Sequence, residues 1–347
     1  MRKELTREAE PERRLLSDVR TLIEAAKEGV ARTANSALVM LYWGVGMRIR
    51  EDILRGKRAS YGRQIVATLS PQLVREHGAG YTPANLFRMI QFATVFSDRR
   101  IVATLWRQLG WSHFREIIPL EDPLKRDFYA EMCRVERWSV RTLRSKIAGM
   151  LYERTALSRK PAKLAAQEVA ALRAEDRMTP DMVFQDPYLL GFLGLKDAYS
   201  EKDLEAAILR KMEEFLLELG AGFAFISRQK RIEVDGRDYY LDLLFYNRHL
   251  KRLVAVELKL DRFQPEHKGQ MELYMKWLDK HERAPGEEPP TGVILCSGKG
   301  REEVELLELD RSGIRVAEYI TGLPSREELE KKLHQALEAA RRDATNR

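Results

Sequence analysis

The chain has 347 residues and carries 60 Lys and Arg against 53 Asp and Glu, a formal net charge of +7. No segment approaches the roughly 18 uncharged apolar residues of a membrane helix, and the charged start, Met1–Leu5, does not resemble a signal peptide. Cys133 and Cys296 are too few and too far apart for a disulfide framework or a cysteine zinc cluster. We therefore expect a cytoplasmic protein with no membrane partner.

The charge is unevenly distributed along the chain. Residues 1–180 hold 33 Lys and Arg against 21 Asp and Glu, a net +12, whereas residues 181–347 hold 27 against 32, a net −5. The length suits two domains, and a basic half suggests that one of them binds a polyanion. The alternative is that the Arg-rich composition only decorates a solvated surface.

The first half has the apolar spacing of helices. Residues 12–56 predict two helices, and residues 63–76 a third with Ile65, Leu69 and Leu73 on one face. A Gly-containing turn over 77–81 leads to Thr82, a candidate N-cap, and Pro83 at the first helical position. Helix, short turn and capped helix together are typical of a helix-turn-helix unit.

Polar side chains on these helices suit nucleic acid. Asn85 and Arg88 stand near the start of the second helix, where a DNA-reading helix contacts bases and phosphates. A similar unit follows, in which Ser139 can cap a helix carrying Arg141 and Arg144. We take these four residues as candidate nucleic-acid contacts, with DNA favoured over RNA. An ordinary helical hairpin is the alternative.

The pattern changes after residue 175. We expect a basic helical domain over 1–175, a linker over 176–187 and a second domain over 188–347, which makes an α+β two-domain protein. The expected helices and strands of the second domain, in order, are helix 201–219, strands 223–234, 239–246 and 253–260, helix 265–280, strand 292–296, helix 301–309, strand 314–319 and helix 325–342. This order is αβββαβαβ followed by a helix, with an αβββαβ core, and it predicts an α/β sheet domain that begins with an antiparallel meander.

Two apolar strands of this domain contain charges that packing alone does not favour. Asp242 interrupts one strand, and Glu257 and Lys259 share one face of the next because strand side chains alternate. Adjacent strands lie about 4.8 Å apart, so the carboxylates can share a pocket, where a hard cation such as Mg²⁺ or Mn²⁺ would join them. A buried Asp242–Lys259 salt bridge without catalysis is the alternative.

This arrangement resembles the PD-(D/E)xK nuclease superfamily, with Gln270 and Tyr274 matching the Gln-x-x-x-Tyr motif of its RecB-like members. Leu241 stands where the superfamily name has Pro. Over roughly residues 12–320 the chain resembles the YhcG family of bacterial PD-(D/E)xK nuclease-domain proteins. The stretches that carry this resemblance are Leu41–Trp43, Trp111–Phe114, Gly222–Phe225, Tyr240–Tyr246, Val256–Lys259 and Gly269–Met271.

The resemblance implies metal-dependent phosphodiester hydrolysis, in DNA repair, recombination or defence. It makes Asp242, Glu257 and the carbonyl of Leu258 metal ligands, with a further glutamate, Glu205 or else Glu213, from the preceding helix. It makes Lys259 a catalytic residue that orients water and offsets charge on the phosphate. It also assigns Gln270 and Tyr274 supporting roles, although Tyr274 is equally suited to packing.

Two other functions are alternatives to a nuclease. A non-catalytic nucleic-acid-binding or assembly protein could retain the nuclease fold, but the three residues Asp242, Glu257 and Lys259 are all present. A small-molecule hydrolase lacks support, because the chain has no Gly-x-Ser-x-Gly, no phosphate-binding Gly loop and no His-Glu zinc motif. A homo-oligomer is compatible with the sequence.

Overall fold

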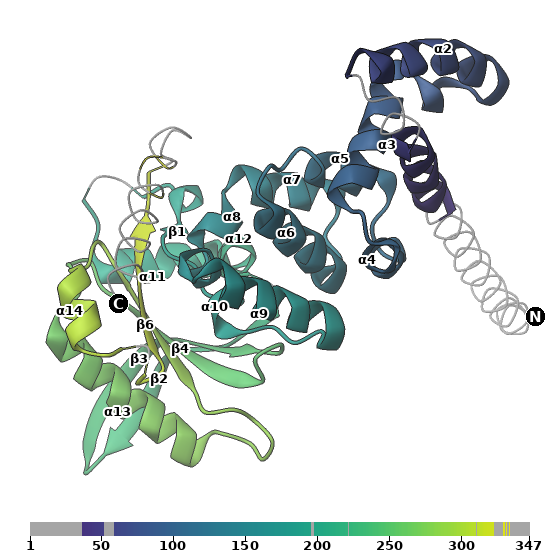
Figure 1. The fold of residues 1–347 in the computed structure, drawn as a ribbon. Helices are drawn as coiled ribbons and strands as arrows, with labels where there is room; N and C mark the ends of the chain where they lie inside the picture. The colour runs from purple at the N-terminus through teal and green to yellow at the C-terminus, as the bar shows by residue number, and fades with distance from the viewer. Residues whose placement is uncertain are drawn as a thin grey trace, which may run out of the picture. The chain divides into compact units, whose positions relative to one another are not determined.

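The structure is a computed structural model, and it describes residues 37–51, 59–195, 198–220, 222–309, 311–322, 329, 331 and 333. The chain divides into two compact units, Met1–Ile147 and Ala148–Arg347, which Figure 1 shows in purple to blue and in teal to yellow. Of the expected terminal helices, residues 12–36 and most of 325–342 lie outside the described residues. No described helix is long and apolar enough to span a membrane.

The first unit is helical throughout its described part. After a helix over residues 37–51, its elements are α2 (Ala59–His77), η1 (Ala79–Tyr81), α3 (Pro83–Val95), α4 (Arg99–Leu105), α5 (Trp111–Ile117), α6 (Pro123–Glu136) and α7 (Val140–Ala148). Asp98 and Asp122 cap α4 and α6 by accepting backbone N–H groups of each first turn. In the described part of this unit, two of the helices thus begin at an aspartate that caps them.

The turn between α2 and α3 is built as the sequence suggests. Gly78 has φ of +87°, a conformation that favours glycine, and Pro83 opens α3. Thr82 takes the N-cap position, but its side chain accepts no capping hydrogen bond. Leu86 and Met89 of α3 are fully buried in the core of this unit. The connectivity is helix, turn, helix, which DNA readers share with ordinary helical hairpins.

The second unit combines helices with one mixed sheet. Its elements are α8 (Leu151–Arg154), η2 (Ala156–Arg159), α9 (Ala162–Glu175), α10 (Pro180–Val183), β1 (Tyr188–Leu189), η3 (Gly191–Leu193), α11 (Glu201–Arg210), α12 (Met212–Leu219), β2 (Phe223–Val234), β3 (Arg237–Asn247), β4 (Arg252–Leu258), α13 (Pro265–His281), β5 (Thr291–Cys296), α14 (Arg301–Leu306) and β6 (Ile314–Ile320). The expected helix over 201–219 is two helices, separated at Lys211.

The sheet has the strand order β1-β6-β5-β4-β3-β2. The meander β2-β3-β4 is antiparallel, whereas β4, β5, β6 and β1 run parallel. Leu244 of β3 packs in one apolar cluster with residues of α13, while the ring of its neighbour Phe245 contacts that of Phe215 in α12. Since successive strand residues face opposite ways, α13 and α12 cover opposite faces of the sheet (Figure 1).

The segment expected to be a linker, residues 176–187, is part of the second unit. It contains α10, and its apolar side chains Met178, Met182 and Phe184 are buried. Upstream, the fully buried Arg154 donates hydrogen bonds to the carbonyl of Pro187 at 3.1 Å and to Glu218 of α12 at 2.5 Å. The division between the compact units therefore lies near residue 147, because buried polar and apolar contacts attach residues 148–187 to the sheet domain.

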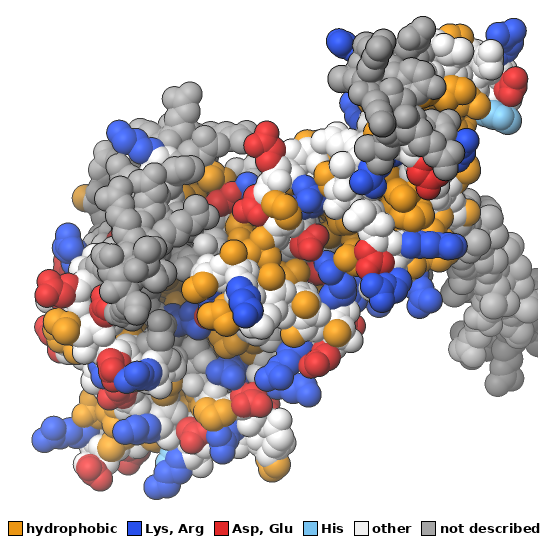
Figure 2. Space-filling model, viewed as in Figure 1, with side chains coloured by type: hydrophobic (Ala, Val, Ile, Leu, Met, Phe, Trp, Pro, Cys, Tyr) orange, Lys and Arg blue, Asp and Glu red, His pale blue; other side chains and the backbone are white. Residues whose placement is uncertain are grey.

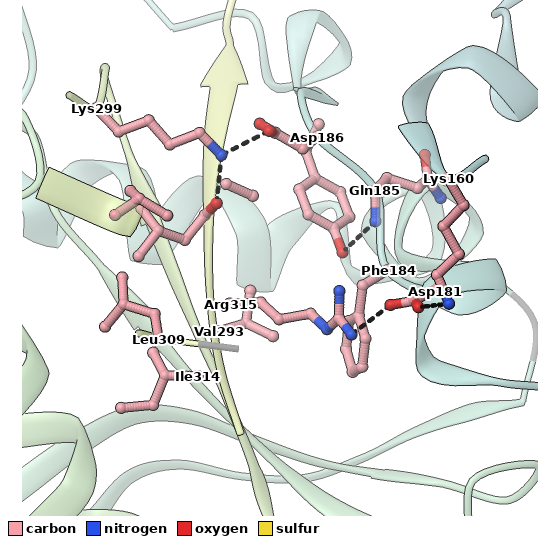
Figure 3. A pocket seen from close by; sticks show the side chains of 14 residues that line it. Lys160, Asp181, Phe184, Gln185, Asp186, Val293, Lys299, Leu309, Ile314 and Arg315 are labelled. Carbon is pink, nitrogen blue, oxygen red and sulfur yellow. Dashed lines mark hydrogen bonds and ion pairs between the residues drawn. The ribbon is translucent and has the colours of Figure 1, made fainter. Parts of the chain in front are cut away.

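Ion pairs also surround a cavity of about 290 Å³ beside this segment. Figure 3 shows Asp181 between Lys160 and Arg315, and Asp186 facing Lys299. These charged groups pair with one another. The cavity contains none of the residues that the sequence assigned to catalysis.

Candidate active site

The register of β3 and β4 sets the two strand carboxylates opposite each other. Leu243 pairs with Val256, and Asp242 and Glu257 are the next residues beyond this last pair on their two strands. The backbone N–H of Leu258 donates to Oδ2 of Asp242 at 2.9 Å, which fixes the Asp242 carboxylate against β4. The structure thus brings together the two residues that the sequence could only place on neighbouring strands.

Lys259 follows directly after β4 and is held by the sheet. Its backbone N–H donates to the carbonyl of Leu295 in β5 at 2.8 Å. Its ammonium donates to Oε1 of Glu257 at 3.2 Å, and the side chain is 16% exposed. The lysine therefore pairs with Glu257 rather than with Asp242, the partner in the non-catalytic alternative.

The helix α13 contributes the next two residues. Gln270 Nε2 donates to Oε1 of Glu257 at 3.1 Å and to the Tyr274 hydroxyl at 2.7 Å. Tyr274 is 1% exposed, and its hydroxyl donates to the carbonyl of Tyr240 on β3 at 3.3 Å. Gln270 therefore contacts the carboxylate directly, while Tyr274 packs in the core and supports Gln270.

Burial shapes the electrostatics of this cluster. Glu257 is 5% exposed, and burial, reinforced by the nearby Asp242 charge, raises its pKa to about 7. Burial also raises the pKa of Asp242, against the hydrogen bonds that it accepts. The second oxygen of Glu257, Oε2, is buried and has no hydrogen-bond partner in the structure. Such an oxygen is costly to leave unpaired, so the site favours a proton or a cation there.

The two candidate helical glutamates behave differently. Glu205 on α11 accepts a hydrogen bond from Gln229 Nε2 at 2.9 Å, and the same nitrogen donates to Oδ1 of Asp242 at 3.0 Å. The carboxylate of Glu213 makes no hydrogen bond or ion pair among the described residues. Glu201, one turn before Glu205, accepts from the backbone N–H of Leu260 at 3.3 Å. Of the two candidates, Glu205 is thus the one linked to the cluster through Gln229, and the charge of Glu201 also contributes to the raised pKa of Asp242.

The donor set fits a divalent cation. Asp242 and Glu257 provide hard oxygen ligands of the kind that Mg²⁺ and Mn²⁺ prefer, and Glu257 Oε2 needs a partner. Within the described residues, no group of three or more His, Cys, Asp or Glu side chains is close enough together to hold a metal ion. A third ligand must therefore come from a main-chain carbonyl, from water or from movement of Glu205.

The candidate nucleic-acid contacts all lie in or next to helices of the first unit. Arg88 and Arg141 are exposed and make no ion pair among the described residues. Asn85 instead donates to the carbonyl of Gly80, and Arg144 pairs with Glu116 at 2.6 Å. Figure 2 shows further Lys and Arg side chains gathered around the position of α4. Two of the four candidates, Asn85 and Arg144, thus already make contacts within the first unit.

Comparison with known proteins gives matches over both parts of the chain. Residues 18–154 match the family described as DUF1016 N-terminal domain, and residues 181–334 match the family described as YhcG PDDEXK nuclease domain. The Escherichia coli (strain K12) protein named "Putative nuclease YhcG" is 32% identical to this chain, and the match covers 90% of this chain and 91% of that protein.

Two solved structures are similar to part of the chain. A repair endonuclease from Pyrococcus abyssi is 22% identical over 35% of this chain, with a TM-score of 0.27. A complex of EndoMS with double-stranded DNA is 19% identical over 36% of this chain, also with a TM-score of 0.27. The matched regions span about half of each solved chain, 49% and 46%.

Proposed function

Because this chain belongs to the YhcG family of PDDEXK nuclease-domain proteins, we propose that it is a metal-dependent endonuclease that hydrolyses phosphodiester bonds in DNA. The observation that carries the proposal is the cluster of Asp242, Glu257 and Lys259 around a buried, unpartnered carboxylate oxygen. The proposed metal ligands are Asp242, Glu257 and the carbonyl of Leu258, with Glu205 as a further ligand.

A Mg²⁺ or Mn²⁺ ion held there would polarise the scissile phosphate and acidify a water molecule. The side chains around it have separate roles. Lys259, 3.2 Å from Glu257, places a positive charge beside the position of the phosphate and offsets the negative charge that develops there. Gln270 fixes the orientation of the Glu257 carboxylate through its 3.1 Å hydrogen bond, and Tyr274 holds Gln270 in place.

The helical unit is proposed to bind the nucleic acid. Its support is the excess of basic residues over 1–180 together with exposed arginines such as Arg88 and Arg141. The proposed nucleic acid is DNA rather than RNA, and the proposed biological role is genome maintenance or defence against foreign DNA. In this scheme the first compact unit, up to residue 147, binds the substrate and the sheet domain cuts it.

The deciding experiment is cleavage of plasmid, linear, branched and single-stranded DNA in the presence of Mg²⁺ or Mn²⁺. Asp242→Ala and Lys259→Ala should each lower the rate at least 100-fold, because each removes a group that acts on the reacting phosphate. The matched control is Glu266→Ala, from a second Glu-x-Lys tripeptide that lies on α13, and it should cut like wild type.

Equal cutting by wild type, Asp242→Ala and Lys259→Ala would contradict the proposal, because a contaminant would then account for the activity. Salt-dependent binding of DNA by a folded protein that cuts no substrate would instead favour the non-catalytic alternative.

A further inference from the structure

Gln229 has an unusual backbone conformation in the middle of β2. Its φ is +45°, in the left-handed region that residues other than glycine seldom adopt. The flanking pairs Arg228–Leu243 and Lys230–Leu241 keep one register, so no inserted residue explains the distortion. The residue is also exposed, so burial in a core does not account for it. Strained residues of this kind concentrate at functional sites.

The side chain of Gln229 connects two elements of the candidate site. Its Nε2 lies 2.9 Å from Oε2 of Glu205 and 3.0 Å from Oδ1 of Asp242, and each carboxylate accepts one hydrogen bond. Glu205 belongs to α11 and Asp242 to β3, and no hydrogen bond joins these two carboxylates directly. A neutral amide that donates to both carboxylates offsets their mutual repulsion and orients both of them towards the same point.

We propose that Gln229 is a positioning residue that holds Glu205 and Asp242 ready to share a divalent cation, and that it thereby sets the metal affinity of the site. The inference rests on the proposed function, since it concerns the same metal site. Without the amide, Asp242 would keep its hydrogen bond from the backbone of Leu258, whereas Glu205 would lose its contact with the cluster. Loss of a residue that orients metal ligands typically costs about 10–100-fold in metal affinity.

The test is Mn²⁺ binding to the full chain, measured by isothermal titration calorimetry. Gln229→Gly removes the amide but suits a positive φ, so it should keep the wild-type Tm while binding Mn²⁺ about 10-fold more weakly or worse. Gln229→Ala should lose the same affinity, which keeps the test valid if the glycine variant folds poorly. The control is Arg228→Ala, an exposed neighbour on β2 that should bind Mn²⁺ like wild type.

A double-mutant comparison identifies the route of the effect. In a Glu205→Ala background, Gln229→Gly should weaken Mn²⁺ binding by much less than it does in wild type, because one of the two groups that it positions is already missing. In cleavage assays, Gln229→Gly should need more Mn²⁺ to reach half-maximal rate, and saturating Mn²⁺ should restore most of the rate.

Wild-type Mn²⁺ affinity in both Gln229→Gly and Gln229→Ala would overturn the inference, even if the wild-type protein cuts DNA. A wild-type protein that binds Mn²⁺ but cuts nothing would overturn the proposed function, and weaker Mn²⁺ binding by the Gln229 variants would still support the inference. The two failures are therefore distinguishable.

Discussion

The ammonium of Lys299 donates a hydrogen bond to Oδ2 of Asp186 at 2.5 Å, although 113 residues separate them in the sequence. The same nitrogen donates to the carbonyl of Val316 in β6. The other oxygen of Asp186 accepts the backbone N–H of Glu318 at 3.0 Å. One carboxylate thus joins the segment before β1 to both the loop after β5 and the strand β6.

Replacing Lys299 with Met should destabilise the second unit. The side chains of Lys299 and Asp186 are 18% and 16% exposed. The loss in free energy of unfolding should therefore be smaller than for a fully buried ion pair, at about 1–3 kcal/mol. Urea unfolding followed by circular dichroism measures it. Lys276→Met, at an exposed position on α13, is the control and should change the free energy of unfolding by less than about 0.5 kcal/mol. A similarly small change for Lys299→Met would contradict the prediction.

The raised pKa of Glu257 predicts a pH dependence of stability in the presence of a chelator. The folded-state pKa is about 7, against an ordinary 4.5, so the native state binds more protons than the unfolded state between these values. The contribution of this carboxyl to stability is therefore greatest below about pH 4.5 and is lost as the pH rises towards 7, with an amplitude on the order of 3 kcal/mol.

Glu257→Gln supplies the control for this prediction. An uncharged amide at this position cannot ionise, so the difference in unfolding free energy between the variant and wild type should widen from pH 4.5 to 7. A constant difference across this range would show that Glu257 ionises normally in the folded protein. Adding Mn²⁺ should reduce the effect, because a cation stabilises the ionised carboxylate.

The helical unit gives a prediction about DNA affinity. Arg88→Ala should weaken binding several-fold and lower the salt dependence of the binding constant by about one ion, because an exposed arginine on α3 is expected to contact a phosphate. Arg341→Ala, near the C-terminus and outside the described residues, removes the same charge and should have a smaller effect. Fluorescence anisotropy at several salt concentrations compares the two. The reverse ranking would place the binding face elsewhere.

The strand charges could be read from the sequence because alternation along a strand is a local property. Asp242, Glu257 and Lys259 stand out against apolar neighbours, and the register of β3 and β4 does bring them together. Gln270 could be placed beside them only through the resemblance to RecB-like nucleases, because its contact with Glu257 depends on how α13 packs on the sheet. Their catalytic roles remain predictions for the cleavage assay.

Other features depend on contacts that no local pattern contains. Gln229 looks like an ordinary polar residue of an edge strand, because a left-handed φ at glutamine leaves no sequence signal. The sequence likewise gives no signal that Arg144 pairs with Glu116 or that Asn85 donates a hydrogen bond within a turn. Residues 176–187 contain prolines and acids typical of a linker, yet Met178 and Phe184 are buried, and the Phe184 ring contacts Phe223 and Arg315, which are far away in the sequence.

The attachment of residues 148–187 to the sheet determines where a nuclease fragment can begin. A fragment starting at residue 188 would leave Glu218 without Arg154 and Lys299 without Asp186, and it would expose the apolar surface that covers Phe184. A fragment starting at residue 148 keeps all three sets of contacts. The shortest piece that folds like the native sheet domain should therefore include residues 148–187, which the sequence divides between the helical domain and a linker.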